Sequence, residues 1–139
     1  MSARAETLLA FDFGARRTGV AIGNTLTRTA RPLTVIAEEQ NDRRFTRIEG
    51  LIREWQPQRL IVGRPCHPDG TAHQMTARCE RFARQLNGRF SLPVELIDER
   101  YSSVAADDDS GLQDDFDGRL GDDALAAATI LRQYLHENP

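Results

Sequence analysis

Two apolar segments near the N-terminus, separated by a short turn, constrain the fold of this chain more than any other feature. The first covers residues 7–13 and is interrupted by a single acid, Asp12; the second covers residues 18–22. The turn between them, residues 14–17, contains Gly14. Short apolar segments joined by a tight turn are typical of neighbouring β-strands. We therefore predict a pair of strands at the start of the chain.

Strand and helix patterns then alternate along the sequence. We expect a polar loop at 38–42, a loop at 63–71 and a solvated segment at 107–118, after a short helix that ends at Ala106. The segment 59–62 is fully apolar apart from its first residue, as expected for a central strand covered on both faces. Together the patterns predict an α/β fold, a mixed five-stranded sheet flanked by helices, in a single domain, 1–139. The predicted strands are 7–13, 18–22, 32–36, 59–62 and 94–97, and the predicted helices are 45–55, 75–86 and 123–135.

Composition excludes several classes of protein. A hydrophobic share of 40% with 28% charged residues is typical of a globular protein, and no apolar segment is long enough to cross a bilayer. The N-terminus lacks the pattern of a signal peptide, so we expect a cytoplasmic protein with no membrane partner. Charge is unevenly distributed: the chain carries sixteen Arg and twelve acids through Ala106, and two Arg and nine acids from Asp107 onward.

Acidic side chains stand at the ends of three predicted elements. Asp12 lies inside an apolar strand, where a buried carboxylate needs a compensating partner such as a metal ion. It could equally cap the turn around Gly14. Glu99 follows another strand, with a surface ion pair to Arg100 as the alternative, and Asp122 and Asp123 precede the last helix, where acids ordinarily stabilise the helix N-terminus.

Six segments together resemble the YqgF (RuvX) family, whose members are described as Holliday junction resolvases and as nucleases that mature the 5′ end of pre-16S ribosomal RNA. The resemblance spans nearly the whole chain in the family's order. The segments are LLAFDFGARRTGVAIGN, TARPL, WQPQRLIVGRP followed by DGT, RFARQLNGRF, VELIDERYSS and GDDALAAATILRQYL.

This resemblance implies a ribonuclease-H-like fold and a metal-dependent nuclease. It places the catalytic acids, which would also hold the metal, at Asp12, Glu99 and the Asp that opens the last helix, aligned to Asp123 with Asp122 as the alternative. Carboxylate ligands suit Mg²⁺ or Mn²⁺, and two such ions can activate water and stabilise the leaving oxygen in phosphodiester cleavage. The expected substrate is pre-16S rRNA or structured DNA, bound by a monomer or a weak homodimer.

Arginines near the predicted site are candidates for contact with the phosphate backbone of a substrate. We interpret three other arginines, Arg78, Arg81 and Arg84, as solvated charges on one helix. The substrate-binding candidates are Arg16, Arg17, Arg31 and Arg64, with Arg28 as a further possibility.

Other functions remain open at this point. The acidic segment after Asp107 should repel phosphate, which favours an RNA-binding or ribosome-assembly factor that does not cut. The segment DFGARRTGVAIGN also resembles the phosphate-binding hairpin of the actin and sugar-kinase superfamily, but those proteins need two lobes and this chain has room for one. A zinc site at Cys66, His67, His73 and Cys79 lacks the paired spacing of structural zinc ligands, and Cys79 fits the apolar face of its helix.

Overall fold

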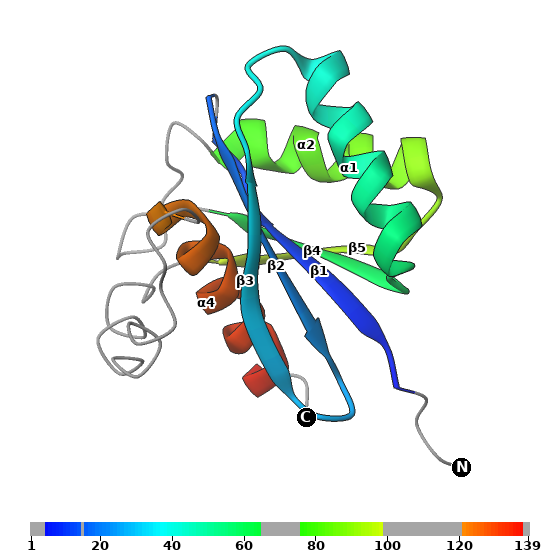
Figure 1. Ribbon diagram of the computed structural model, residues 1–139, viewed down its shortest axis with the longest axis vertical. Coiled ribbons are helices and arrows are strands. Elements are labelled where there is room, and N and C mark those ends of the chain that lie inside the picture. Colours follow the sequence, from blue (N-terminus) through cyan, green and yellow to red (C-terminus); the bar gives the residue numbers. More distant parts are fainter. Residues whose placement is uncertain (1–4, 15, 65–75, 99–120, 138–139) are drawn as a thin grey trace.

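The computed structural model describes residues 5–14, 16–64, 76–98 and 121–137. These residues form a sheet with helices on both faces (Figure 1). The predicted short helix up to Ala106, the acidic segment and most of the loop at 63–71 lie outside the described residues. The elements are β1 (Thr7–Asp12), β2 (Thr18–Asn24), β3 (Thr29–Ile36), α1 (Asn41–Trp55), β4 (Arg59–Arg64), α2 (Thr76–Phe90), β5 (Val94–Asp98) and α4 (Gly121–Glu137).

The sheet has five strands in the order β3-β2-β1-β4-β5. The turns between β1, β2 and β3 are short, so these strands pair antiparallel, whereas the helical crossovers before β4 and β5 make those strands parallel to β1. The predicted mixed sheet of five strands is therefore confirmed. Because β1, β4 and β5 run the same way, their carboxyl ends meet at one edge of the sheet.

Two apolar clusters hold the layers together, one on each face of the sheet. Side chains alternate along a strand, so Leu9 and Phe11 of β1 face α1 and α2, while Leu8 and Ala10 face α4. Phe82 of α2 lies at the centre of the first cluster and contacts three other phenylalanine rings, with centroid distances of 4.7 to 5.8 Å. Central strand β4 is buried on both faces from residue 60 to 63, as predicted.

Several elements are longer than the sequence predicted. β3 begins at Thr29 because its first three residues still pair with the end of β2. It tolerates Pro32 because it is an edge strand with a register shift at this point. α1 begins at Asn41, inside the predicted polar loop, and Asp42 in its first turn suits the positive end of the helix dipole. β4 continues through Arg64, where it pairs with β5.

Candidate functional site

Asp12 ends β1 at the carboxyl edge of the sheet, and α4 begins beside it. Alternation along β1 turns the half-buried Asp12 side chain toward α4. The neighbouring residue on β2 is Gly19, which pairs with Asp12 in the sheet. A Cβ at Gly19 would clash with the backbone oxygen of Asp123. The absence of a side chain at Gly19 therefore lets the first turn of α4 rest on the sheet next to Asp12.

The two carboxylates interact unfavourably when both are charged. Burial, reinforced by the negative charge of Asp123, raises the pKa of Asp12 from 3.8 to about 6. No hydrogen bond or ion pair from the part of the chain that the structure describes reaches the Asp12 carboxylate. A half-buried acid that has a second acid beside it, and no cationic side chain paired with it among the described residues, fits a site for a positive ligand.

Two of the arginines predicted to bind substrate lie at this site. Arg17, in the turn between β1 and β2, places Nη1 3.9 Å from Oδ2 of Asp123, and its side chain is 67% exposed. Arg16 is the exposed residue next to it. A long ion pair between exposed groups is weak, so Arg17 can turn from Asp123 toward a phosphate at little cost.

Arg64 lies at the same edge but is held by two acids. Its Nε donates to Oδ1 of Asp98 at 2.8 Å, and its Nη1 donates to Oε2 of Glu80 at 2.9 Å. These hydrogen bonds, first the one to Asp98, raise the pKa of the Arg64 guanidinium. The structure thus places Arg64 in ion pairs between β4, β5 and α2.

Arg28 and Arg31 lie toward the other end of the sheet. Arg28 donates to the backbone oxygen of Leu135 at 2.7 Å, near the end of α4. Arg31 is exposed on edge strand β3 and pairs with Ile22, which in turn pairs with Leu9, three residues before Asp12. Neither arginine is part of the cluster around Asp12.

The described residues include only some of the predicted ligands. Glu99, Cys66, His67 and His73 lie outside the described residues, as does the side chain of Asp122. Within the described residues, no group of three His, Cys, Asp or Glu side chains is positioned to hold a metal ion. Cys79 is 1% exposed and packs in the cluster around Phe82, which confirms its predicted place in the core.

The donors that are described suit a hard divalent cation. Asp12 and Asp123 both offer carboxylate oxygens, the ligands that Mg²⁺ and Mn²⁺ prefer. A cation held by these carboxylates would offset both the burial and the repulsion by Asp123 that raise the pKa of Asp12. The chemistry of this donor set therefore fits the metal that the sequence resemblance implies.

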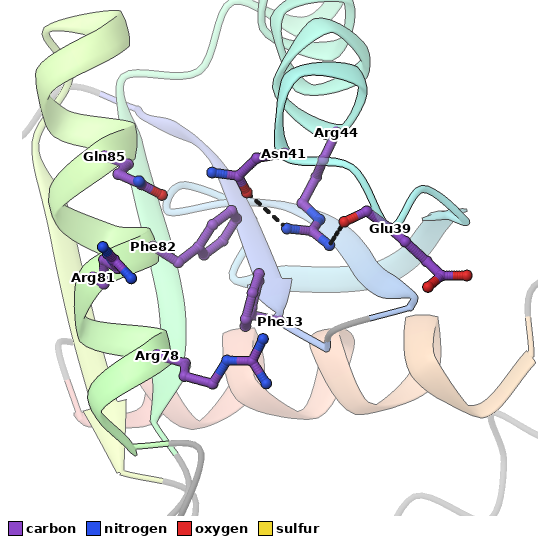
Figure 2. Close-up of a pocket in the computed structure, with 8 residues that line it drawn as sticks. All are labelled: Phe13, Glu39, Asn41, Arg44, Arg78, Arg81, Phe82 and Gln85. Carbon is purple, nitrogen blue, oxygen red and sulfur yellow. Dashed lines mark hydrogen bonds between the residues drawn. The ribbon is translucent and has the colours of Figure 1, made fainter.

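A second feature was missed by sequence reasoning. On the opposite face of the sheet, α1 and α2 enclose a pocket of about 350 Å³ beside Phe13, the residue that follows Asp12 (Figure 2). Arg78 and Arg81 are exposed, as the sequence suggested, but they also line this pocket together with Arg44. A signal was present, since Arg44 precedes Ile48, Leu51 and Trp55 on the apolar face of its helix. The described lining residues are Phe13, Glu39, Asn41, Arg44, Arg78, Arg81, Phe82 and Gln85.

Structures of known proteins agree with the fold. The RuvC of Thermus thermophilus, solved with a Holliday junction substrate, superposes with a TM-score of 0.61 and 18% sequence identity, covering 95% of this chain and 94% of that one. The fowlpox virus Holliday junction resolvase gives a TM-score of 0.60 and 11% identity, covering 94% and 98%. At such low identity these likenesses establish the ribonuclease-H-like fold and no more. No helix of the described segments is long and apolar enough to cross a membrane.

Comparison with sequence relatives identifies the family of the chain as well as its fold. A protein of Burkholderia cenocepacia (strain HI2424) named "Putative pre-16S rRNA nuclease" is 54% identical over 140 residues, covering 98% of this chain and 93% of the relative. A protein of the same name from Burkholderia multivorans is 53% identical over the same share of each chain. The family model described as "RuvX: Holliday junction resolvase" matches residues 6–137. The chain therefore belongs to the RuvX family.

Proposed function

We propose that this chain is a divalent-metal-dependent nuclease that hydrolyses phosphodiester bonds. One observation carries the proposal: the half-buried carboxylate of Asp12 lies beside Asp123 at the carboxyl edge of the sheet, its pKa is raised, and no cationic side chain among the described residues pairs with Asp12 itself. Such an arrangement of acids is unfavourable for the fold alone and is explained by a positively charged ligand. We assign the activity to the whole chain, 1–139, as one domain.

The metal ligands in this proposal are Asp12, Glu99 and Asp123, which are also the catalytic residues. When bound, Mg²⁺ or Mn²⁺ lowers the pKa of water and stabilises the charge that develops on the cleaved phosphodiester. Gly19 keeps α4 against β2, so that Asp123 stays next to Asp12. Arg17 competes for the Asp123 carboxylate until a substrate phosphate offers a better partner.

The substrate-binding residues in this proposal are Arg16, Arg17, Arg31 and Arg64. Arg16 and Arg17 contact the phosphates nearest the cleaved bond, since both are exposed beside the acids. Arg31 offers an exposed guanidinium for a more distant phosphate. Arg64 binds a substrate phosphate only after it releases Asp98 or Glu80, because these two acids hold it in the absence of substrate.

The proposed substrate is the 5′ end of pre-16S ribosomal RNA in the cytoplasm. The relatives at 54% and 53% identity carry pre-16S rRNA in their names, and they match this chain over nearly its whole length. A four-way DNA junction is the second candidate, favoured by the description of the family model. A monomer suffices for one RNA cut, whereas a junction presents two symmetric cleavage points and calls for a homodimer.

A cleavage assay with matched variants tests the proposal. Purified protein is incubated with Mn²⁺ or Mg²⁺ and either a 5′-extended pre-16S rRNA or a four-way DNA junction. We expect cleavage of the RNA by the wild type, and none by Asp12→Asn, Glu99→Gln or Asp123→Asn. Asp42→Asn is the control, since that side chain is 97% exposed on α1.

Each outcome has a distinct meaning. Cleavage of the junction alone would replace the RNA with the second substrate. Cleavage that survives Asp123→Asn but not Asp122→Asn would move the third ligand to the neighbouring acid. Folded wild type that binds RNA in EDTA and cuts neither substrate with either metal would contradict the nuclease and support a binding factor.

A further inference from the structure

The pocket between α1 and α2 lies close to the proposed cleavage site but on the other face of the sheet. Phe13 lines the pocket, and Asp12, its neighbour in the chain, points to the α4 face. The two sites are therefore separated by the end of β1. A nucleic acid strand that passes over this edge can contact both sites without any movement of the sheet.

Several contacts hold Arg44 at the base of the pocket. Arg44 is only 3% exposed, and its guanidinium donates to Oδ1 of Asn41 at 2.9 Å and to the backbone oxygen of Glu39 at 3.4 Å (Figure 2). It also donates to the backbone oxygen of Glu38 at 3.0 Å. The same guanidinium lies 4.9 Å from the centroid of the Phe13 ring. Phe13 in turn stacks on Phe82 at 4.7 Å. These contacts fix a positive charge before any ligand arrives.

The charges around the pocket are predominantly positive. Arg44, Arg78 and Arg81 line it, and Glu39 is the one acid among the described lining residues. Burial and the nearby charge of Arg78 lower the pKa of the Arg44 guanidinium, which shows that the surroundings disfavour more positive charge. Arg78 and Arg81 are three residues apart on α2 and therefore share a helix face. An anion in the pocket would relieve this repulsion.

We propose that this pocket binds a phosphate group of the substrate strand, away from the bond that is cleaved. Guanidinium groups match phosphate oxygens with paired hydrogen bonds, and the amides of Asn41 and Gln85 offer further donors. A pocket of about 350 Å³ admits a phosphate with part of its sugar. The assignment of this phosphate to the substrate strand rests on the proposed function. The alternative source is a free nucleotide.

Binding rather than cleavage tests the proposal. A fluorescent single-stranded RNA is titrated with Asp12→Asn protein, so that no product forms, at several salt concentrations. Into this background we introduce Arg78→Gln, Arg81→Gln and both together. Arg84→Gln is the matched control, because Arg84 is exposed on the same helix and lies outside this pocket. Thermal unfolding checks that all variants are folded, as expected for exposed positions.

We expect the double variant to bind RNA at least about tenfold more weakly, as expected for the loss of charge-assisted hydrogen bonds. The slope of log K against log salt should fall by about 0.7 for each lost phosphate contact. Arg84→Gln should change neither quantity. Equal weakening by Arg84→Gln, or unchanged binding by the double variant, would overturn the proposal.

A second arm separates the two sources of phosphate. Adenosine monophosphate is titrated into the same proteins without RNA. Tight binding of the mononucleotide that is lost in the double variant, with RNA binding intact, would contradict a strand site. This binding assay does not depend on cleavage. A protein that cuts nothing in the cleavage assay above, but shows the expected loss of RNA binding here, would refute the nuclease and leave the phosphate pocket standing.

Discussion

Replacing Asp12 with Asn should stabilise the metal-free protein at neutral pH. In the folded state the pKa of Asp12 is raised from 3.8 to about 6, so the fold holds the proton more tightly than the unfolded chain does. Ionisation therefore costs stability as the pH rises from about 4 to about 6, and the whole cost is present above that window. A rise of about two pKa units corresponds to about 3 kcal/mol. Asn keeps the shape of the side chain and removes the charge.

Urea unfolding in EDTA measures this effect. At about pH 7.5 we expect the free energy of unfolding of Asp12→Asn to exceed that of the wild type by up to about 3 kcal/mol, with an unchanged m-value. Below about pH 4 the two proteins should be equally stable, because Asp12 is then protonated in both states.

The matched control is Asp98→Asn, which removes the charge of one of the two acids paired with Arg64 and should lower stability instead. The reasoning fails if Asp12→Asn is no more stable than the wild type at neutral pH. It fails equally if the gain is the same at both pH values, since a pH-independent gain cannot come from the charge.

Three further predictions follow from the same geometry. Gly19→Ala should push α4 off β2 and cost about 1–3 kcal/mol or more in urea unfolding, with loss of cleavage; wild-type stability would contradict the close approach of Asp123. Phe82→Ala should cost about 3–5 kcal/mol, because Phe82 is central to the core, and a loss under about 1 kcal/mol would argue against that cluster. Mn²⁺ affinity measured by calorimetry should fall about tenfold per pH unit below about pH 6, as the proton competes for Asp12; affinity that is flat with pH would exclude that carboxylate as a ligand.

Local patterns were sufficient to predict most of the fold. The apolar segments around Asp12 and the short turn after it predict a pair of strands, and the helical period before Arg59 predicts a helix between two strands of a mixed sheet; the structure pairs the first two strands antiparallel and makes β4 parallel to β1. Element ends were less predictable. β3 begins with Thr29, a polar residue whose place in the sheet is decided by its partner Asn24 rather than by its own pattern.

The candidate site was predictable only in part, because it depends on contacts between distant segments. The sequence indicates that Asp12 is unusual, but its proximity to Asp123 depends on how α4 packs against Gly19. In the same way, the sequence alone suggests that Arg64 binds phosphate. The pairing of β4 with β5 places Asp98 next to Arg64, and this contact is visible only in the structure.

The pocket between α1 and α2 could not be predicted from the sequence for the same reason. Arg44 comes from α1 and Arg78 from α2, and nothing local in either helix indicates that they line one pocket with Phe13.

Binding of Mn²⁺ to the metal-free protein tests the central claim most directly. Electron paramagnetic resonance distinguishes free from bound Mn²⁺ and needs no nucleic acid substrate. We predict that the wild type and Asp42→Asn bind Mn²⁺, and that Asp12→Asn and Asp123→Asn bind it far more weakly. Equal binding by all four proteins, or no binding by the folded wild type, would contradict a metal site at Asp12 and Asp123.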